Sequence, residues 1–184
     1  MDVSSTPPLI SVEEYLHTSY PDGDREYLDG VVVERNVGTP AHSALQKILI
    51  IHFGAYEKQF NLAIRPECRS RIENTRYRVP DVMVMVKPFK QSNRVVLDTP
   101  FIIVEILSPD DRMSSTIQRF RDYDRLGVPY IIQMDPEDRT TFVYVSGDLV
   151  RRDLTTIEVP GGGPLPFDTR ALLNELDEQG IDQD

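Results

Sequence analysis

The first third of the chain shows two helical patterns separated by an alternating one. Ser11 can cap a helix that begins in ISVEEYL, and Glu14 completes a capping box. The Asp-Gly pair at 29–30 lies between two apolar runs and is a strong signal for a β-hairpin. Thr39 and Pro40 then begin a long helix whose apolar residues recur at helical spacing. The sequence therefore predicts a short helix, a hairpin and a long amphipathic helix.

From Leu62 onward, short apolar runs typical of strands replace this pattern. Residues 80–86 (PDVMVMV) and 101–107 (FIIVEIL) are apolar enough to be buried strands, joined by a loop. Further strands are expected at 62–73, 128–135, 140–147 and 148–154, helices at 113–127 and 168–180, and a loop at 160–166. This order predicts one α/β domain spanning 1–184, with a core of about 12–176 and a mixed β-sheet flanked by helices.

Composition narrows the class of protein. The chain has 184 residues, of which 40% are hydrophobic and 27% charged, and its net charge is −10. This charge argues against a protein that binds nucleic acid over its whole surface, whereas clustered carboxylates attract divalent cations. No segment approaches the roughly 20 apolar residues of a membrane span. Residues 1–11 have neither a basic start nor an apolar segment, so we expect no signal peptide and a cytoplasmic location.

An acidic residue interrupts or begins each of the two buried strands. Glu105 lies inside the run 101–107, and Asp81 begins the other run directly after Pro80. A buried carboxylate is costly unless something compensates its charge. One interpretation is structural: an arginine pairs with Glu105, and Asp81 simply ends a strand. The other interpretation is that the two acids act together.

The spacing of the two strands allows the acids to meet. If the strands are antiparallel neighbours, pairing residues 85–86 with 101–102 places Asp81 opposite residue 105 or 106. Two carboxylates held together cannot both stay ionised without a cation. Oxygen ligands on adjacent strands suit Mg²⁺ or Mn²⁺. We therefore expect a divalent-metal site at this end of the sheet.

The helix predicted after Glu105 brings a cation toward the same region. At about 100° per residue, Phe120, Met113 and Tyr123 fall on an apolar half of this helix, whereas Asp122 falls on the polar half. Arg119 falls inside the apolar half, beside Tyr123. It either points toward the core side near Glu105 or reaches outward from the edge of the apolar half, as long cationic side chains often do.

Three segments taken together resemble a known family. RVPDVMVM, PFIIVEILSPDDR and RFRDYDRLGVPYIIQMDP are similar to the Uma-type restriction endonuclease family, which belongs to the PD-(D/E)XK nuclease superfamily. Upstream, REYLDG resembles the N-terminal hairpin of the family and PAHSALQKIL its first long helix. A Pro-Asp pair with a distant acid would be weak evidence, but these segments are specific jointly. The resemblance covers about Val12 to Val145.

The resemblance implies a restriction-endonuclease-like core and a set of site residues. It implies that Asp81 and Glu105 bind a divalent metal, with the backbone carbonyl of Ile106 as a further ligand. The superfamily places a lysine two residues after the second acid, where this chain has Leu107. The resemblance implies that in this family the lysine lies on the next helix instead, four residues before Tyr123. This chain has Arg119 at that position. Arginine keeps the positive charge but cannot act as a base.

Three other residues match positions of the family. Glu26, in the hairpin, could support the metal, and Tyr123 belongs to the same motif as Arg119. His42 also matches a family position, although we favour a capping or surface histidine there. Val31 departs from the family, which carries an acid at that position of the hairpin.

Several arginines between residues 65 and 78 could supply a basic surface. With strand alternation, Arg65, Arg69 and Arg71 share one face of an extended strand, and Arg76 and Arg78 share a face of the next. Such runs are usually solvated strand faces, but this one is also compatible with binding of nucleic acid.

Three hypotheses follow. The leading one is an endonuclease that uses Mg²⁺ or Mn²⁺, acts on nucleic acid with DNA as the expected form, does not bind membranes, and forms a homodimer in which strand 140–147 offers a free edge. The second is a nuclease fold with weak or no cleavage that serves as a binding or assembly module, as Arg119 and the acidic charge suggest. The third is a structural dimer whose acids are ion-paired.

Overall fold

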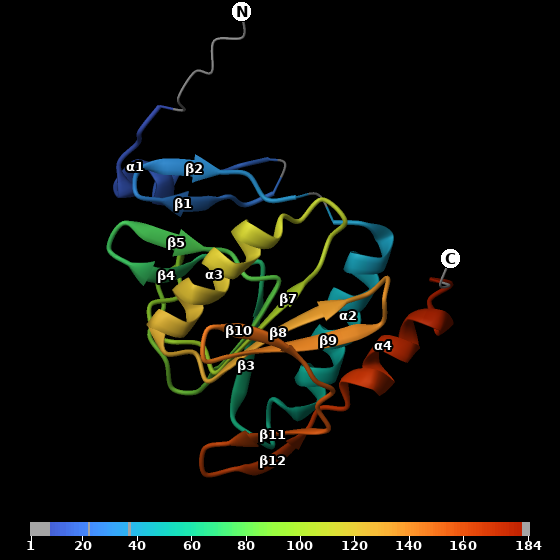
Figure 1. Ribbon diagram of the computed structural model, residues 1–184. Helices are drawn as coiled ribbons and strands as arrows, with labels where there is room; N and C mark the ends of the chain where they lie inside the picture. The colour runs from blue at the N-terminus through green and yellow to red at the C-terminus, as the bar shows by residue number, and fades with distance from the viewer. Residues whose placement is uncertain (1–7, 22, 37, 182–184) are drawn as a thin grey trace, which may run out of the picture.

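The computed structural model describes residues 8–21, 23–36 and 38–181 and shows a mixed α/β fold (Figure 1). Its largest sheet has six strands in the order β10-β9-β8-β7-β6-β3. The bounds of these strands are β3 Leu62–Pro66, β6 Val82–Val86, β7 Ile102–Ile106, β8 Tyr130–Asp135, β9 Thr140–Val145 and β10 Asp148–Arg151. Only β7 and β8 run parallel, so the predicted mixed sheet is confirmed.

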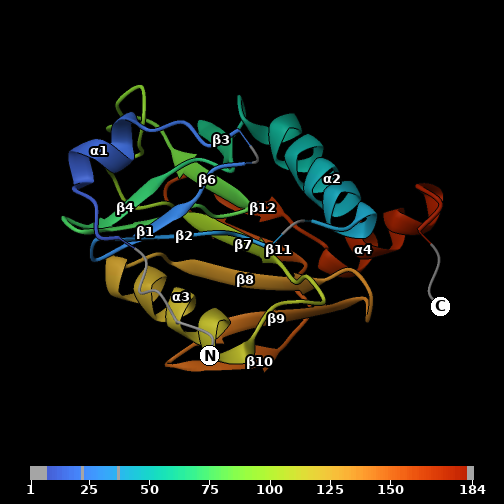
Figure 2. The same ribbon diagram turned by 90° about the horizontal axis from the view of Figure 1, so that it is seen from above.

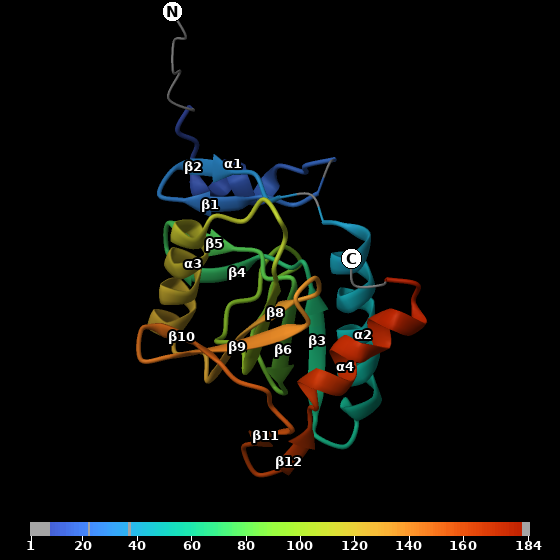
Figure 3. The same cartoon turned by 45° about the vertical axis from the view of Figure 1, so that its right-hand side comes forward.

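Helices cover both faces of this sheet (Figures 2 and 3). α2 (Pro40–Tyr56) and α4 (Thr169–Glu178) lie on one face, and α3 (Met113–Leu126) lies on the other. Alternation along β7 explains the two layers, because Ile102 and Val104 belong to the core cluster that includes α2 and α4, whereas Ile103 packs with the aromatic residues of α3. Thr39 caps α2, as the sequence predicts, Asp168 caps α4, and Gly127 ends α3 in the left-handed conformation.

A second sheet has four strands in the order β2-β1-β5-β4. Its strands are β1 Glu26–Leu28, β2 Val31–Val33, β4 Ser70–Glu73 and β5 Arg76–Arg78. The predicted hairpin joins β1 to β2, and Asp29 and Gly30 both take positive φ values, 52° and 98°. The predicted cap also forms, since Ser11 accepts a hydrogen bond from the backbone N–H of Glu14 at the start of α1 (Val12–His17).

Three sequence predictions about the sheets and helices are wrong. The segment 62–73 is not one extended strand, because β3 belongs to the six-stranded sheet and β4 to the four-stranded one. Strand β9 is not an edge, because β10 pairs with it along its outer side. Part of the loop expected at 160–166 instead forms a hairpin of β11 (Thr156–Val159) with β12 (Gly163–Pro166).

Within the described ranges, the helices are too short or too polar for any of them to cross a membrane.

The pairing of β6 with β7 fixes the region of interest. These strands are antiparallel, with Val82 opposite Val104 and Val84 opposite Ile102. Continuing this register by one residue places Asp81 opposite Glu105, which is one of the two positions, 105 or 106, that the sequence predicted. Paired residues share a face of the sheet, and the neighbouring Ile103 faces α3, so both acids lie at the end of the sheet on the α3 side.

Candidate active site

Asp81 and Glu105 are both buried at this end of the sheet, with exposed fractions of 3% and 4%. Asp81 directly precedes β6, and Glu105 is the fourth residue of β7. The backbone N–H of Ile106 donates a hydrogen bond of 2.7 Å to Oδ2 of Asp81. The Asp81 carboxylate is therefore tied to the strand that carries Glu105.

Two basic side chains also contact Asp81. Nη2 of Arg35 donates to Oδ1 of Asp81, and Nε2 of His42 lies 3.3 Å from Oδ2. His42 is buried at the first turn of α2, so the expected capping or surface histidine is wrong. The backbone carbonyl of Asp81 accepts a hydrogen bond of 3.0 Å from the side-chain amide of Gln46. Helix α2 and the segment after β2 thus hold Asp81 from two sides.

Glu105 is contacted by α3. The hydroxyl of Tyr123 donates to Oε1 of Glu105 at 2.5 Å, and Nη1 of Arg119 lies 3.4 Å from Oε2. This contact decides between the two interpretations of Arg119, which points toward the core side. Nε of Arg119 lies 3.5 Å from Oε1 of Glu26, a distance too long to satisfy that buried donor. Arg119 therefore lies between two acids without a short bond to either.

The two acids have opposite shifts of pKa. Burial raises the pKa of Glu105 to about 7, and the charge of Asp81 adds to this effect against the opposing influence of Arg119 and Tyr123. Burial also disfavours ionisation of Asp81, but the hydrogen bond from His42, the charge of Arg35 and the N–H of Ile106 together lower its pKa. The pair therefore carries one firmly ionised carboxylate and one that takes up a proton near neutral pH.

A divalent metal suits this pair. Two carboxylates on adjacent strands, one of them forced toward its neutral form, are stabilised as ions by a shared cation. Among the described residues, no group of three or more His, Cys, Asp or Glu side chains could hold a metal ion. Remaining ligands would be water or backbone oxygen, which agrees with the preference of Mg²⁺ for one or two carboxylates and several waters.

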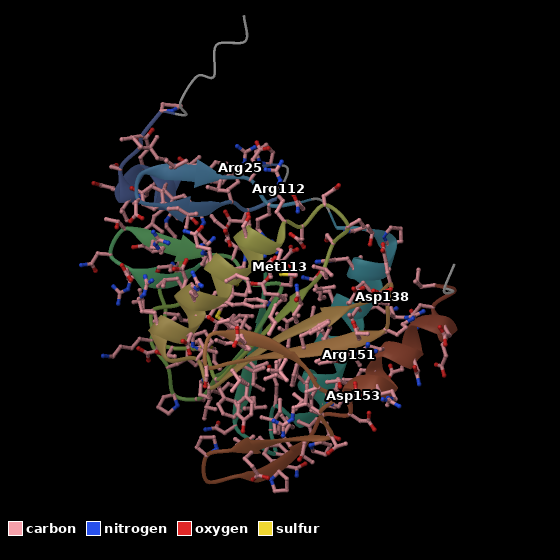
Figure 4. The ribbon with its side chains drawn as sticks, viewed as in Figure 1. Arg25, Arg112, Met113, Asp138, Arg151 and Asp153 are labelled. Carbon is pink, nitrogen blue, oxygen red and sulfur yellow. The ribbon has the colours of Figure 1, made fainter. Side chains whose placement is uncertain are left out.

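Beside the site lies a buried ion-pair cluster, which we define as Glu26, Arg76, Arg78 and Asp122. Arg78 donates to Glu26 at 2.5 Å and to Asp122 at 2.6 and 2.8 Å. Arg76 lies 3.2 Å from the other oxygen of Asp122. Asp122 lies on the polar half of α3, as the sequence predicts, but it is buried where Arg76 and Arg78 of β5 contact it. Other polar residues of this half are exposed, namely Gln118, Arg121 and Arg125. Conversely, Met113 on the apolar half is 68% exposed at the start of α3 (Figure 4).

The arginines between 65 and 78 do not form one basic face. Arg69 and Arg78 are buried, with Arg69 held by Asp24 and by the backbone carbonyls of α1. Arg76 is paired with Asp29 and Asp122, and only Arg71 is fully exposed. The face predicted for Arg65, Arg69 and Arg71 fails because β3 and β4 belong to different sheets. Arg76 and Arg78 of β5 do share a face, and both contact Asp122. Binding of nucleic acid by Arg69, Arg71, Arg76 and Arg78 stays a prediction, and burial restricts it for two of them.

Two residues of the site were missed in the sequence. Arg35 follows β2 in a stretch whose pattern gives no sign of a partner 46 residues away. Gln46 is a polar residue on the same face of α2 as several apolar residues. Its place on that face was the only sign in the sequence of a role in the site. Taken together, the site combines two buried acids, a tyrosine and a histidine bound to them, and two arginines. This set can hold a divalent cation and stabilise negative charge on a phosphate.

Comparisons with known proteins identify the family and the fold. The model of the Uma2 family, described as "Putative restriction endonuclease", matches residues 12–169. No curated protein matches the chain. A crystal structure of a protein from Anabaena variabilis, titled a putative nuclease belonging to DUF820, has a similar fold. Its TM-score is 0.74 at 22% identity, and the match covers 91% of this chain and 99% of that one.

The fold match supports a restriction-endonuclease-like architecture, and the family match spans every candidate residue of the site. This chain belongs to the Uma2 family of restriction endonuclease-like proteins.

Proposed function

We propose that this protein is a metal-dependent endonuclease that hydrolyses phosphodiester bonds of nucleic acid. The observation that carries the proposal is the register of β6 and β7, which sets Asp81 opposite Glu105 with Arg119 next to the pair. Arginines contact both acids, but among the described residues the nearest cation to Glu105 lies 3.4 Å away and burial still raises the pKa of Glu105 to about 7, which favours a site that takes a further cation over a simple ion pair.

Each residue has a role in this proposal. Asp81, Glu105 and the carbonyl of Ile106 would hold Mg²⁺ or Mn²⁺. When bound, such an ion polarises the phosphate and lowers the pKa of a bound water. Arg119 stabilises negative charge on the phosphate, and Tyr123 fixes the Glu105 carboxylate through its 2.5 Å hydrogen bond. His42 orients Asp81, and Glu26 holds the other side of Arg119.

A cleavage assay tests the proposal. Wild type and Glu105→Gln are incubated with single- and double-stranded DNA and with RNA, in Mg²⁺, Mn²⁺ or EDTA. We expect the variant to lose at least about 10²-fold in rate, the size of effect seen when one group that stabilises the transition state is removed. Glu175→Gln, at an exposed position of α4, is the matched control and should cleave like wild type. Equal cleavage by wild type and Glu105→Gln, or no cleavage of any substrate, would refute the nuclease proposal.

A catalytically weak binding or assembly module is the second candidate, and Arg119 is the observation that favours it. Arginine occupies the place of the family lysine and cannot accept a proton from water. Arg119→Lys therefore tests this candidate: a clear gain in cleavage with unchanged metal affinity would show that arginine limits the wild-type rate. Calorimetric titration of wild type and Asp81→Asn with metal completes this test. A metal site should lose its affinity in Asp81→Asn, whereas a purely structural acid pair would bind no metal in wild type or in the variant.

The proposal also covers the substrate and the assembly state. DNA is the proposed form of nucleic acid, and preferential cleavage of RNA in the same assay would contradict it. A homodimer is proposed as the active species, and sedimentation equilibrium at micromolar concentrations checks it.

A further inference from the structure

Arg35 has a contact that the proposed chemistry does not use. It lies in the segment after β2, its side chain is 17% exposed, and its Nη2 donates to Oδ1 of Asp81. A single arginine from the hairpin segment thus supplies positive charge at the place where the acid pair requires it.

The two oxygens of Asp81 are not equivalent. Oδ2 accepts the backbone N–H of Ile106 at 2.7 Å and faces His42, so the sheet itself holds it. The contact of Oδ1 among the described residues is with Arg35 alone. A cation that binds Asp81 without breaking the sheet must therefore approach Oδ1, which is the oxygen that Arg35 holds.

A second acceptor for Arg35 lies close by. Its Nη1 is 3.7 Å from Oε1 of Glu67, whose side chain is 55% exposed. Both residues line a hollow of about 340 Å³, together with Arg25, Glu34 and Asn36. The guanidinium therefore has space and a carboxylate on the side away from Asp81.

Charge repulsion prevents Arg35 and a divalent cation from occupying Asp81 at the same time. Arg35 and a divalent cation at the same carboxylate oxygen would repel each other at close range, where the protein screens charge less than water does. We propose that Arg35 is a displaceable counter-ion of Asp81, which a divalent cation must replace, and that Glu67 receives the guanidinium when it leaves. This inference rests on the proposed metal site and adds the residue that regulates entry to it.

Calorimetric titration with Mn²⁺ alone, without nucleic acid, tests the inference. Arg35→Ala removes the competitor, so we expect its affinity for Mn²⁺ to rise by about 10-fold, the change that 1.4 kcal/mol produces. Arg35→Gln keeps a hydrogen-bond donor without the charge and should also bind more tightly than wild type. Thermal melting of both variants shows that they fold.

Glu67→Gln should change the affinity for Mn²⁺ in the opposite direction. Without its second acceptor Arg35 stays on Asp81, and affinity should fall by about 2–5-fold, the size of a partly exposed pair. The double variant Arg35→Ala/Glu67→Gln should bind like Arg35→Ala, because Glu67 acts through Arg35. Arg25→Ala is the matched control: Arg25 lines the same hollow but pairs with Glu34, at the hairpin side of the molecule (Figure 4).

The outcomes separate the two proposals. If wild type binds Mn²⁺ and Asp81→Asn does not, but both Arg35 variants match wild type or bind more weakly, the metal site stands and the role of Arg35 is refuted. If neither wild type nor any Arg35 variant binds Mn²⁺, both the metal site and this inference are refuted. If only the Arg35 variants bind Mn²⁺ and wild type does not, the result supports the inference, because Arg35 would then exclude the ion from Asp81 in wild type.

Discussion

The buried ion-pair cluster and the Asp81–Glu105 pair lie side by side but are built differently. In the cluster, two arginines face two acids, and Arg78 makes bonds of 2.5–2.8 Å to both. At the pair, Arg119 reaches Glu105 only at 3.4 Å, and burial raises the pKa of Glu105 to about 7. Buried charge alone therefore does not mark a functional site in this protein. What distinguishes the pair is that Glu105 has no cation among the described residues within a short hydrogen bond, whereas both acids of the cluster do.

The largest effect is expected from breaking the cluster. Arg78→Met leaves Glu26 and Asp122 buried without their main cation, which should lower the free energy of unfolding by about 3–5 kcal/mol. Urea denaturation followed by circular dichroism measures this loss. Arg71→Met, at an exposed position of the neighbouring strand, serves as its control and should change stability by no more than about 0.5 kcal/mol. A similar small change for Arg78→Met would show that the cluster is not structural.

Glu105→Gln should stabilise the metal-free protein, in contrast to Arg78→Met. Below its ordinary pKa of 4.5 the carboxyl is protonated in both folded and unfolded chains and costs nothing. Between pH 4.5 and about 7 only the folded chain keeps the proton, so the stability of wild type falls as pH rises, and above about 7 the loss is complete. The neutral amide avoids this loss, with a gain of about 1–3 kcal/mol at pH 8.

Thermal melts in EDTA at pH 5 and pH 8 measure this difference between Glu105→Gln and wild type. The melting temperatures should differ more at pH 8 than at pH 5. If Glu105→Gln were less stable than wild type at pH 8, Glu105 would stabilise the fold as the acids of the buried ion-pair cluster do.

Tyr123→Phe should have a smaller effect that still separates the two regions. It removes the hydrogen bond to Glu105, at a cost of about 1–2 kcal/mol of stability, and raises the pKa of Glu105 further. Because a metal ligand must be deprotonated, the pH at which Mn²⁺ binds should move upward. Titrations between pH 6 and 9 measure this shift. An unchanged pH dependence would mean that Tyr123 does not act on the ionisation of Glu105.

Arg125→Ala should have the smallest effect. Arg125 is 59% exposed and lies at the outer edge of the cluster, 3.0 Å from Glu73 and 3.7 Å from Asp122. Exposed pairs contribute about 0–1 kcal/mol, so urea denaturation should detect little change. A loss as large as that of Arg78→Met would show that the buried cluster depends on its exposed neighbour Arg125.

Much of the fold and the centre of the site follow from local patterns. The capped helices, the Asp-Gly hairpin and the two buried strands each have a signal within a few residues. Counting from residues 85–86 opposite 101–102 placed Asp81 opposite residue 105 or 106, and the structure has the first of these. Helical spacing placed Arg119 in the apolar half of its helix, and the structure chose the core-facing one of its two possible directions. These predictions succeeded because periodicity is set by the backbone alone.

The missed features depend on contacts between distant segments. Arg35 meets Asp81 only because the hairpin segment crosses to the end of the other sheet, and no periodicity reports that crossing. The sequence placed Asp122 on the polar half of its helix but gave no sign of its burial, because the arginines of β5 that contact it lie more than 40 residues away. The hairpin of β11 and β12 was hidden by glycine and proline, which are as typical of loops as of tight turns.

The hydrogen bond from the backbone N–H of Ile106 to Asp81 also means that the site forms only when β6 and β7 pair in the native register. The β6–β7 ladder ends at Val82 opposite Val104, and the side chain of Asp81 continues it by one further bond. A chain that paired these strands one residue out of step would turn one acid to the opposite face and lose this bond. Affinity for Mn²⁺ would thus distinguish native molecules from misregistered ones during refolding.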